Sequence, residues 1–261
     1  MIKALNTAAT GMSAQEAEVN NISNNIANIN TIGFKKSRTE TEDLLYNTIQ
    51  SPGARSTAST RYSVGVQVGS GTKISATRKE FTQGSSKITN NPFDLMINGD
   101  GFFAVILPNN EVRYTRDGAF NVDENGNMVN KRGYKLFPGL VIPPNVKSIH
   151  ISTDGKVDCY FTNTPEATNL GTIPVFIFIN PVGLQSMGEN MYQITQSSGT
   201  PLQGIAGTEN VGIIQQGALE ASNVNIMNEM TNLIRAQRAY EMNSKVMGVA
   251  DQMLQTVNNI R

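Results

Sequence analysis

The 261-residue sequence has no tryptophan, one cysteine, one histidine and no excess charge of either sign. The single Cys159 excludes an internal disulfide framework. With one histidine and one cysteine, the common metal-ligand clusters of these two residue types cannot be assembled. Lys plus Arg and Asp plus Glu number 21 each, so no net field draws the chain to nucleic acid or anionic lipid.

Long apolar runs are also missing. The longest, Phe102–Leu107 and Val175–Ile179, have the length of strands and fall far below the roughly 18 residues that a membrane-spanning helix needs. Polar residues interrupt any apolar stretch in the first 19 residues, MIKALNTAATGMSAQEAEV, so we expect no cleavable secretory signal. Export, if it occurs, is therefore expected to use another route.

Residues 1–33 show the periodicity of an amphipathic helix. Apolar side chains recur there in alternating steps of three and four residues, as in packed helices. Interrupted only by Gln15, this stripe consists of Leu5, Ala8, Met12, Val19, Ile22, Ile26 and Ile29. We assign its large side chains to a subunit interface. Gly33 follows the last periodic turn, where a left-handed cap favours glycine, and Phe34 is expected to fold back on the helix end.

Residues 223–261 show helical periodicity as well. The helix is expected to begin around Ser222, Asn223 and Asn225, whose short side chains can cap free N–H groups, with Glu229 near its positive end. A seven-residue repeat, also assigned to the subunit interface, comprises Ile226, Leu233, Tyr240, Met247 and Leu254. A second stripe on another face comprises Met242, Val246, Val249, Met253 and Ile260. Two apolar faces need neighbours on two sides, of which one is the N-terminal helix and another subunit is a candidate for the other.

The segment between the helices predicts short strands joined by turns. Turn-forming dipeptides are Asn109-Asn110, Asp117-Gly118, Asn125-Gly126 and Asp154-Gly155. The expected strands are Asp94–Asn98, Phe102–Leu107, Glu111–Thr115, Met128–Lys131, Ile149–Ser152, Val157–Phe161 and Val175–Ile179. Before them, the polar residues 47–63, with SPGARSTAST at their centre, argue for an extended or irregular connector.

These patterns predict an α+β fold. Its N- and C-terminal helices pair as a coiled-coil-like layer, and a mostly antiparallel β domain is inserted between them. The predicted divisions are a helical core of residues 1–36 plus 223–261, extended connectors at 37–87 and 205–222, and a β-rich outer domain at 88–204.

Residues 20–30, NNISNNIANIN, contain six asparagines. Asparagine costs up to roughly 0.7 kcal/mol per helical position relative to alanine, or about 4 kcal/mol over six positions. Burying the apolar stripe, at about 1.5–3 kcal/mol per large side chain, offsets this cost only when partner helices are present. We therefore expect the chain ends to fray in isolation and to become ordered on assembly. The amides are suited to bridging packed helices, and a solvated polar face is the alternative.

Three motifs resemble those of the bacterial flagellar rod and hook proteins, an axial protein family. The first is NNISNNIANINTIGFKKSR at residues 20–38, with matching positions at Asn20, Asn21, Asn24, Asn25, Asn28, Asn30, Gly33 and Phe34. The second is SNVNIMNEMTNLIRAQRAYEMNSK at residues 222–245, with matching positions at Ser222, Asn223, Asn225, Arg238 and Tyr240. The third, in the β region, is NPFDLMINGDGFFAV followed by YTRDGAFNVDENGNMV. Ile226-Met227-Asn228 departs from the family pattern, which more often has a small residue and an acid there.

Chain length and residues 64–84 are most similar to the distal rod members of this family. A proximal rod subunit of similar size, or a hook-type subunit, is the alternative. The resemblance implies a helical homopolymer that crosses the periplasm in the flagellar basal body and carries torque from motor to hook. Implied partners are further copies, proximal rod proteins, the hook protein, the surrounding ring (bushing) proteins and the flagellar type III export apparatus. It implies no enzyme activity, cofactor or metal, no nucleic-acid partner and no lipid-spanning segment.

An enzyme is the main alternative class, but its candidate motifs are weak. His150 lies in a predicted strand between two isoleucines, as a strand residue rather than a catalytic base. Asn98–Gly101 lacks the spacing of a phosphate loop, and Asp123–Asn127 lacks the glutamate of a calcium loop. Acidic residues directly follow the basic cluster at 35–38, which argues against a nucleic-acid patch. A tube built from sheets is a second alternative, and the two terminal helices argue against it.

Overall fold

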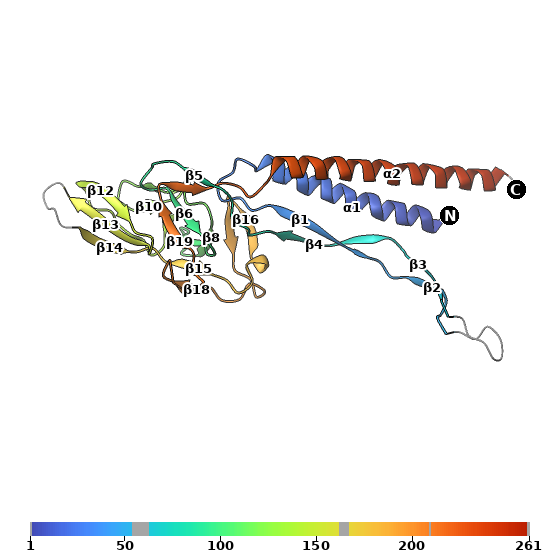
Figure 1. Ribbon diagram of the computed structural model, residues 1–261, viewed down its shortest axis with the longest axis horizontal. Helices are drawn as coiled ribbons and strands as arrows, with labels where there is room; N and C mark the ends of the chain where they lie inside the picture. The colour runs from blue at the N-terminus through green and yellow to red at the C-terminus, as the bar shows by residue number, and fades with distance from the viewer. Residues whose placement is uncertain (1, 54–62, 162–166, 209, 260–261) are drawn as a thin grey trace. The chain divides into compact units, whose positions relative to one another are not determined.

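The computed structural model describes residues 2–53, 63–161, 167–208 and 210–259 (Figure 1). These residues form two compact units. The first comprises Met1–Ala27, Ser37–Lys79 and Asn225–Arg261, and the second comprises Asn28–Lys36 and Glu80–Val224. The β-rich second unit is therefore inserted between the helical segments of the first, which confirms the predicted α+β class.

The first unit contains the two predicted helices. Helix α1 spans Ile2–Ala27 and helix α2 spans Ile226–Asn259, with 26 and 34 residues. At 1.5 Å per residue they are about 39 and 51 Å long. They lie side by side in Figure 1, in blue and red, and pack against each other.

The rest of the first unit is a pair of antiparallel ladders. Strand β1 (Ser37–Asp43) pairs with β4 (Thr72–Lys79), and β2 (Asn47–Gln50) pairs with β3 (Val66–Val68). We call these two ladders the β arm. Helix α1 contacts the β arm, since the Thr72 N–H donates to Thr10 Oγ1 at 3.4 Å. The compact unit thus includes residues 37–79, for which the sequence indicated only an extended connector. Most of the predicted connector centre SPGARSTAST, residues 54–60, lies outside the described residues.

The second unit is built from antiparallel strand pairs. Its largest sheet has seven strands in the order β16-β17-β8-β7-β11-β10-β9. These strands are β7 (Phe103–Ile106), β8 (Val112–Thr115), β9 (Asn121–Val122), β10 (Met128–Val129), β11 (Lys135–Leu136), β16 (Gln185–Gly188) and β17 (Met191–Gln193). A three-stranded sheet contains β12 (Val146–Ile151), β13 (Lys156–Phe161) and β14 (Thr168–Thr172).

Three further two-stranded ladders complete the second unit. They pair β15 (Val175–Ile177) with β18 (Leu202–Gly204), β6 (Leu95–Asn98) with β19 (Ile213–Gln216), and β5 (Ser86–Ile88) with β20 (Ala218–Glu220). A short 3₁₀ helix spans Pro181–Gly183. Each of the seven strands expected from the sequence overlaps an observed strand, which confirms the mostly antiparallel β domain.

The second unit holds the large hydrophobic cores. One is aliphatic and centres on residues such as Leu95, Val105 and Val157, whose side chains are fully or almost fully buried. The other is aromatic, with Phe102 packed edge-to-face against Phe81, Phe178 and Tyr192. This burial gives the unit the means to fold without a partner.

Two turn predictions were wrong in detail. Helix α1 ends at Ala27, six residues before Gly33, because Asn28 and Thr31 form a turn through Thr31 N to Asn28 O. Gly33 therefore does not cap α1, although it does adopt a left-handed φ of 68°. Asp117-Gly118 is not a hairpin turn. The Gly118 carbonyl accepts from the Leu95 N–H at 3.0 Å, and a Cβ at Gly118 would collide with the Leu95 carbonyl.

Candidate assembly interface

Helices α1 and α2 run antiparallel. Asn25, near the end of α1, contacts Glu229 in the first turn of α2, and Gly11, near the start of α1, faces Asn243 further along α2. A Cβ built at Gly11 would lie 2.9 Å from Asn243 Nδ2, so glycine leaves room for the Asn243 side chain against α1.

The start of α2 is capped as predicted. Asn225 Oδ1 accepts the N–H groups of Met227 at 3.0 Å and Asn228 at 3.3 Å. Glu229 lies in the first turn, where a carboxylate complements the positive helix end. Glu229 is only 5% exposed, so its carboxylate lies inside the first unit.

The asparagines of α1 divide into two groups. Asn25 is buried; its Nδ2 donates to Ser37 O at 2.8 Å and to Glu229 Oε2 at 3.3 Å, and its Oδ1 accepts the Ser37 N–H at 2.9 Å. Asn21 Nδ2 donates to Thr39 Oγ1 at 3.1 Å. Asn20 and Asn24 are exposed. Both interpretations of the cluster therefore apply, each to different residues.

The contact between the helices buries mainly small side chains. The buried apolar residues are Ala8, Ala14 and Ile22 in α1 and Ala236 and Ala250 in α2. Alanine offers little apolar area, so the pair derives limited hydrophobic stabilisation from its own contact.

Most large residues predicted for the subunit interface lie outside that buried contact. Those that are half-buried are Leu5, Met12, Val19, Ile26, Leu233, Met247 and Leu254. Ile226 and Tyr240 are exposed, whereas Ile22 is buried. Ile29 is half-buried but lies in the turn after α1, not in the helix. Apart from Ile22, these predicted helical residues retain apolar area that a further copy can cover.

The second stripe of α2 is exposed, as a face without a partner would be. Its described members are Met242, Val246, Val249 and Met253, and Met242 is the most exposed of them at 61%. Ile260 lies outside the described residues. An apolar stripe of this extent on one helix favours a protein–protein contact.

A groove of about 380 Å³ lies between the two helices. Val19 and Tyr240, both predicted interface residues, line it together with Glu16, Asn20, Gln237 and Glu241. Val19 belongs to a seven-residue repeat in α1 with Leu5, Met12 and Ile26. Tyr240 belongs to a seven-residue repeat in α2 with Ile226, Leu233, Met247 and Leu254. Each repeat therefore follows one flank of its helix. The groove thus lies along the predicted heptad stripes.

The sequence analysis missed apolar residues on the β arm of the first unit. Leu45, at 90% exposure, and Tyr46 lie between β1 and β2, and Ile49 lies in β2. Alternation of polar and apolar residues in this segment is too short to distinguish a strand from a connector. Their exposure adds a second apolar surface to the first unit.

A buried ionic cluster joins distant segments of the second unit. Lys35 Nζ contacts Glu220 Oε1 at 2.6 Å with both side chains 0% exposed, and Arg116 Nη1 lies 3.5 Å from Glu220 Oε2. Gly84 N–H also donates to Glu220 Oε1. Burial lowers the pKa of Lys35 below its ordinary value, and the charge of Glu220 opposes that shift. The cluster is structural, since both cations contact the Glu220 carboxylate within the unit.

Asn223, a family-motif residue, makes a second link in this unit. Its Oδ1 accepts the Lys36 N–H at 2.8 Å, and its Nδ2 donates to Glu80 O at 2.8 Å. The other motif residues of the unit are Asn28 (half-buried), Asn30 (exposed), and Gly33, Phe34 and Ser222 (buried). Arg238, in α2, is exposed. The family-motif residues are therefore distributed over both units.

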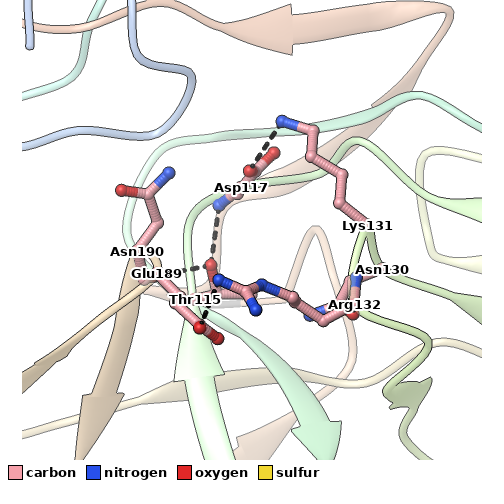
Figure 2. A pocket seen from close by; sticks show the side chains of 7 residues that line it. All are labelled: Thr115, Asp117, Asn130, Lys131, Arg132, Glu189 and Asn190. Carbon is pink, nitrogen blue, oxygen red and sulfur yellow. Dashed lines mark hydrogen bonds and ion pairs between the residues drawn. The ribbon is translucent and has the colours of Figure 1, made fainter.

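A polar pocket of about 190 Å³ in the second unit is shown in Figure 2. Lys131 Nζ pairs with Asp117 Oδ2 at 3.2 Å, and Arg132 Nη2 pairs with Glu189 Oε1 at 2.7 Å. Thr115 Oγ1 donates to Asn190 O and accepts from Asp117 N. These groups satisfy one another, which favours a structural role over ligand binding.

The remaining candidates for chemistry are dispersed. His150 is exposed on β12. Cys159 is buried on β13, and burial, aided by the charge of Asp158, raises the pKa of its thiol. Among the described residues, no group of three or more His, Cys, Asp or Glu side chains is placed to hold a metal ion. Neither described helix combines the length and apolar character needed to span a membrane.

Comparisons with known proteins account for all three sequence motifs. Residues 5–35 match the "Flagella basal body rod protein" family, residues 96–159 the "Flagellar hook protein FlgE/F/G D1 domain" and residues 215–260 the "Flagellar basal body rod FlgEFG protein C-terminal". Among solved structures, the flagellar hook protein FlgE2 of Helicobacter pylori aligns over 71% of this chain and 43% of its own, with 12% identity and a TM-score of only 0.24.

Curated relatives match over full length. The flagellar basal-body rod protein FlgG of Borreliella burgdorferi is 45% identical over 100% of this chain and 99% of its own. The proteins of that name from Buchnera aphidicola (subsp. Schizaphis graminum) and Caulobacter vibrioides are 42% and 43% identical, each with both chains fully covered. The chain belongs to the flagellar basal-body rod protein family.

Proposed function

We propose that this chain is the structural subunit of the flagellar distal rod, a helical homopolymer that transmits torque from the motor to the hook. The observation that carries the proposal is the helix pair of the first unit, which leaves both its groove and the second stripe of α2 uncovered. Full-length similarity to basal-body rod proteins supports the same role. The role requires no chemical step, so no catalytic residue is assigned.

Order in the helix pair is proposed to depend on assembly. Five asparagines lie within α1, which costs up to about 3.5 kcal/mol of helix propensity relative to alanine. Few large apolar side chains are buried between α1 and α2 to offset that cost. Further copies would cover the exposed Met242 and Val249, at about 25 cal/mol per Å² of apolar area. Assembly therefore supplies the stabilisation that a single copy lacks.

Torque transmission follows from such packing. In this proposal, α1 and α2 of many copies form the inner layer of the polymer. The arm with Leu45 and Ile49 gives each copy a further apolar contact surface. Many close-packed contacts pass strain from one copy to the next, because close-packed protein interiors transmit strain.

The proposed neighbours follow from this role. Proximal rod proteins lie below the polymer, the hook protein lies above it, and the ring proteins surround it as a bushing across the periplasm. Equal numbers of acidic and basic residues limit electrostatic adhesion to such a bushing. Subunits are proposed to reach the site unfolded through the flagellar type III export apparatus.

Electron microscopy of concentrated purified protein tests the proposal. We expect short rods or helical polymers that appear above a critical concentration. A chain that remains monomeric at high concentration, with the helix pair ordered, would contradict the rod function.

A further inference from the structure

The two flanks of α2 carry different chemistry. Gln237, Tyr240 and Glu241 face the groove, whereas the second stripe lies on another flank. Arg235 precedes Met242 by seven residues and so lies in line with that stripe. Successive helix residues are about 100° apart, which places Gln237 roughly 200° from Arg235, on the opposite side of α2.

Both acidic and apolar side chains line the groove. Glu16 and Glu241 supply two carboxylates, one from each helix, and Val19 and Tyr240 supply apolar surface. In the part of the chain that the structure describes, neither carboxylate forms an ion pair or a hydrogen bond. A site of this kind suits a cationic side chain with an apolar stem, and the ring of Tyr240 can receive a guanidinium by a cation–π contact.

The opposite flank of α2 presents such a side chain. Arg235 is exposed, and among the described residues no carboxylate pairs with it. Met242 and Val246 continue the same flank as exposed apolar residues. A basic end and an apolar stripe on one flank thus complement the acidic, partly apolar groove on the other.

We propose that the groove between α1 and α2 receives the Arg235–Met242 flank of α2 from a second copy of this chain. Each copy then uses one groove and one flank, which makes the contact heterologous. Such contacts generate an open helical polymer when the rotation between copies does not close a ring. The inference rests on the proposed polymer function and names the residues and the charge pairing of one of its interfaces.

Charge reversal tests the pairing. The variants Glu16→Lys and Arg235→Glu each place like charges at the proposed contact while preserving helix propensity to within a few tenths of a kcal/mol. Each is expected to raise the critical concentration for polymerisation about tenfold or more. Lys156→Glu, an exposed reversal in β13 of the second unit, is the matched control and should polymerise like the unaltered chain.

Mixing the two variants makes the test specific. The lysine that Glu16→Lys places in the groove can pair with the glutamate that Arg235→Glu places on the flank, and the unaltered groove of one variant fits the unaltered flank of the other. An equimolar mixture, and the double variant, should therefore return the critical concentration to within about threefold of the unaltered chain. Restoration also excludes misfolding, since two misfolded chains would not rescue each other.

The outcomes separate this inference from the proposed function. Single variants that polymerise normally, or a mixture and double variant that both fail while the unaltered chain polymerises, overturn the groove pairing alone. An unaltered chain that never polymerises overturns the rod function itself.

Discussion

The side-chain amide of Asn25 in α1 donates a hydrogen bond of 3.3 Å to the carboxylate of Glu229 in α2, across 204 positions of sequence. The same amide group also bonds both backbone groups of Ser37 in β1. One buried asparagine thus ties together three elements of the first unit. A residue of low helix propensity at this position is explained by these contacts, which alanine cannot make.

Asn25→Ala should destabilise the first unit by about 1–3 kcal/mol, because it leaves the buried Glu229 carboxylate and the Ser37 backbone with fewer partners. In polymers this loss should appear as a critical concentration raised by about tenfold or more. Sedimentation at graded protein concentrations measures it. Ser23→Ala, at an exposed site of the same helix, is the control. Equal critical concentrations for the two variants would show that the Asn25 contacts do not matter.

Ile26→Asp should prevent polymerisation, because it places an unpaired charge on the heptad stripe of α1 that further copies are proposed to cover. A loss of about 3 kcal/mol per contact corresponds to a critical concentration raised by more than about a hundredfold. Electron microscopy and sedimentation give the readout, with Ser23→Asp as the exposed control. Normal rods from Ile26→Asp would refute the assignment of this stripe to the subunit interface.

The buried cluster of the second unit predicts unequal effects of its members. Glu220→Gln leaves Lys35 and Arg116 buried without the carboxylate that both contact, and should lower the free energy of unfolding by about 3–5 kcal/mol. Lys35→Met leaves Glu220 paired with Arg116 and should cost less. Urea unfolding followed by the amide signals of the β strands compares the two. A larger loss for Lys35→Met would contradict the central position of Glu220.

Alkaline pH should weaken the second unit through Tyr192. Burial raises the pKa of this phenol far above its ordinary value of 10.0, so the folded state keeps a proton that the unfolded chain releases. Its contribution to stability is complete below about pH 10 and declines as the pH rises further. The lowered pKa of Lys35 acts in the opposite direction, because the folded state then binds fewer protons than the unfolded one below 10.5.

Comparing variants isolates the phenol. Tyr192→Phe should flatten the fall in unfolding free energy between about pH 9.5 and 11, whereas Tyr160→Phe, at an exposed site, is the control. Urea titrations at several pH values give the slopes. An unchanged slope in Tyr192→Phe would show that this group does not carry the alkaline sensitivity.

The sequence predicted the elements whose patterns are long or strongly punctuated. The heptad repeats that contain Val19 and Tyr240 predicted the two helices, and dipeptides such as Asn125-Gly126 predicted hairpin turns. The cap at Asn225 followed from its side chain and position. These features are local, so sequence separation does not hide them.

Features that depend on distant segments escaped the sequence analysis. The end of α1 at Ala27 is set by the Asn28–Thr31 turn, and β1 pairs with β4 although neither has a clear alternation of apolar residues. The contact of Lys35 with Glu220 spans 185 positions, which charge counts cannot reveal. Nor did the sequence show that the contact between α1 and α2 buries alanines such as Ala236, which leaves apolar area on the larger residues for other copies to cover.

The central claim is that α1 and α2 become ordered only when copies of the chain assemble. Amide NMR of dilute, monomeric protein tests it most directly. We expect sharp, poorly dispersed signals from residues 2–27 and 226–259 beside a dispersed set from the β strands of the second unit. Dispersed and exchange-protected signals from both helices in the dilute monomer would contradict the claim.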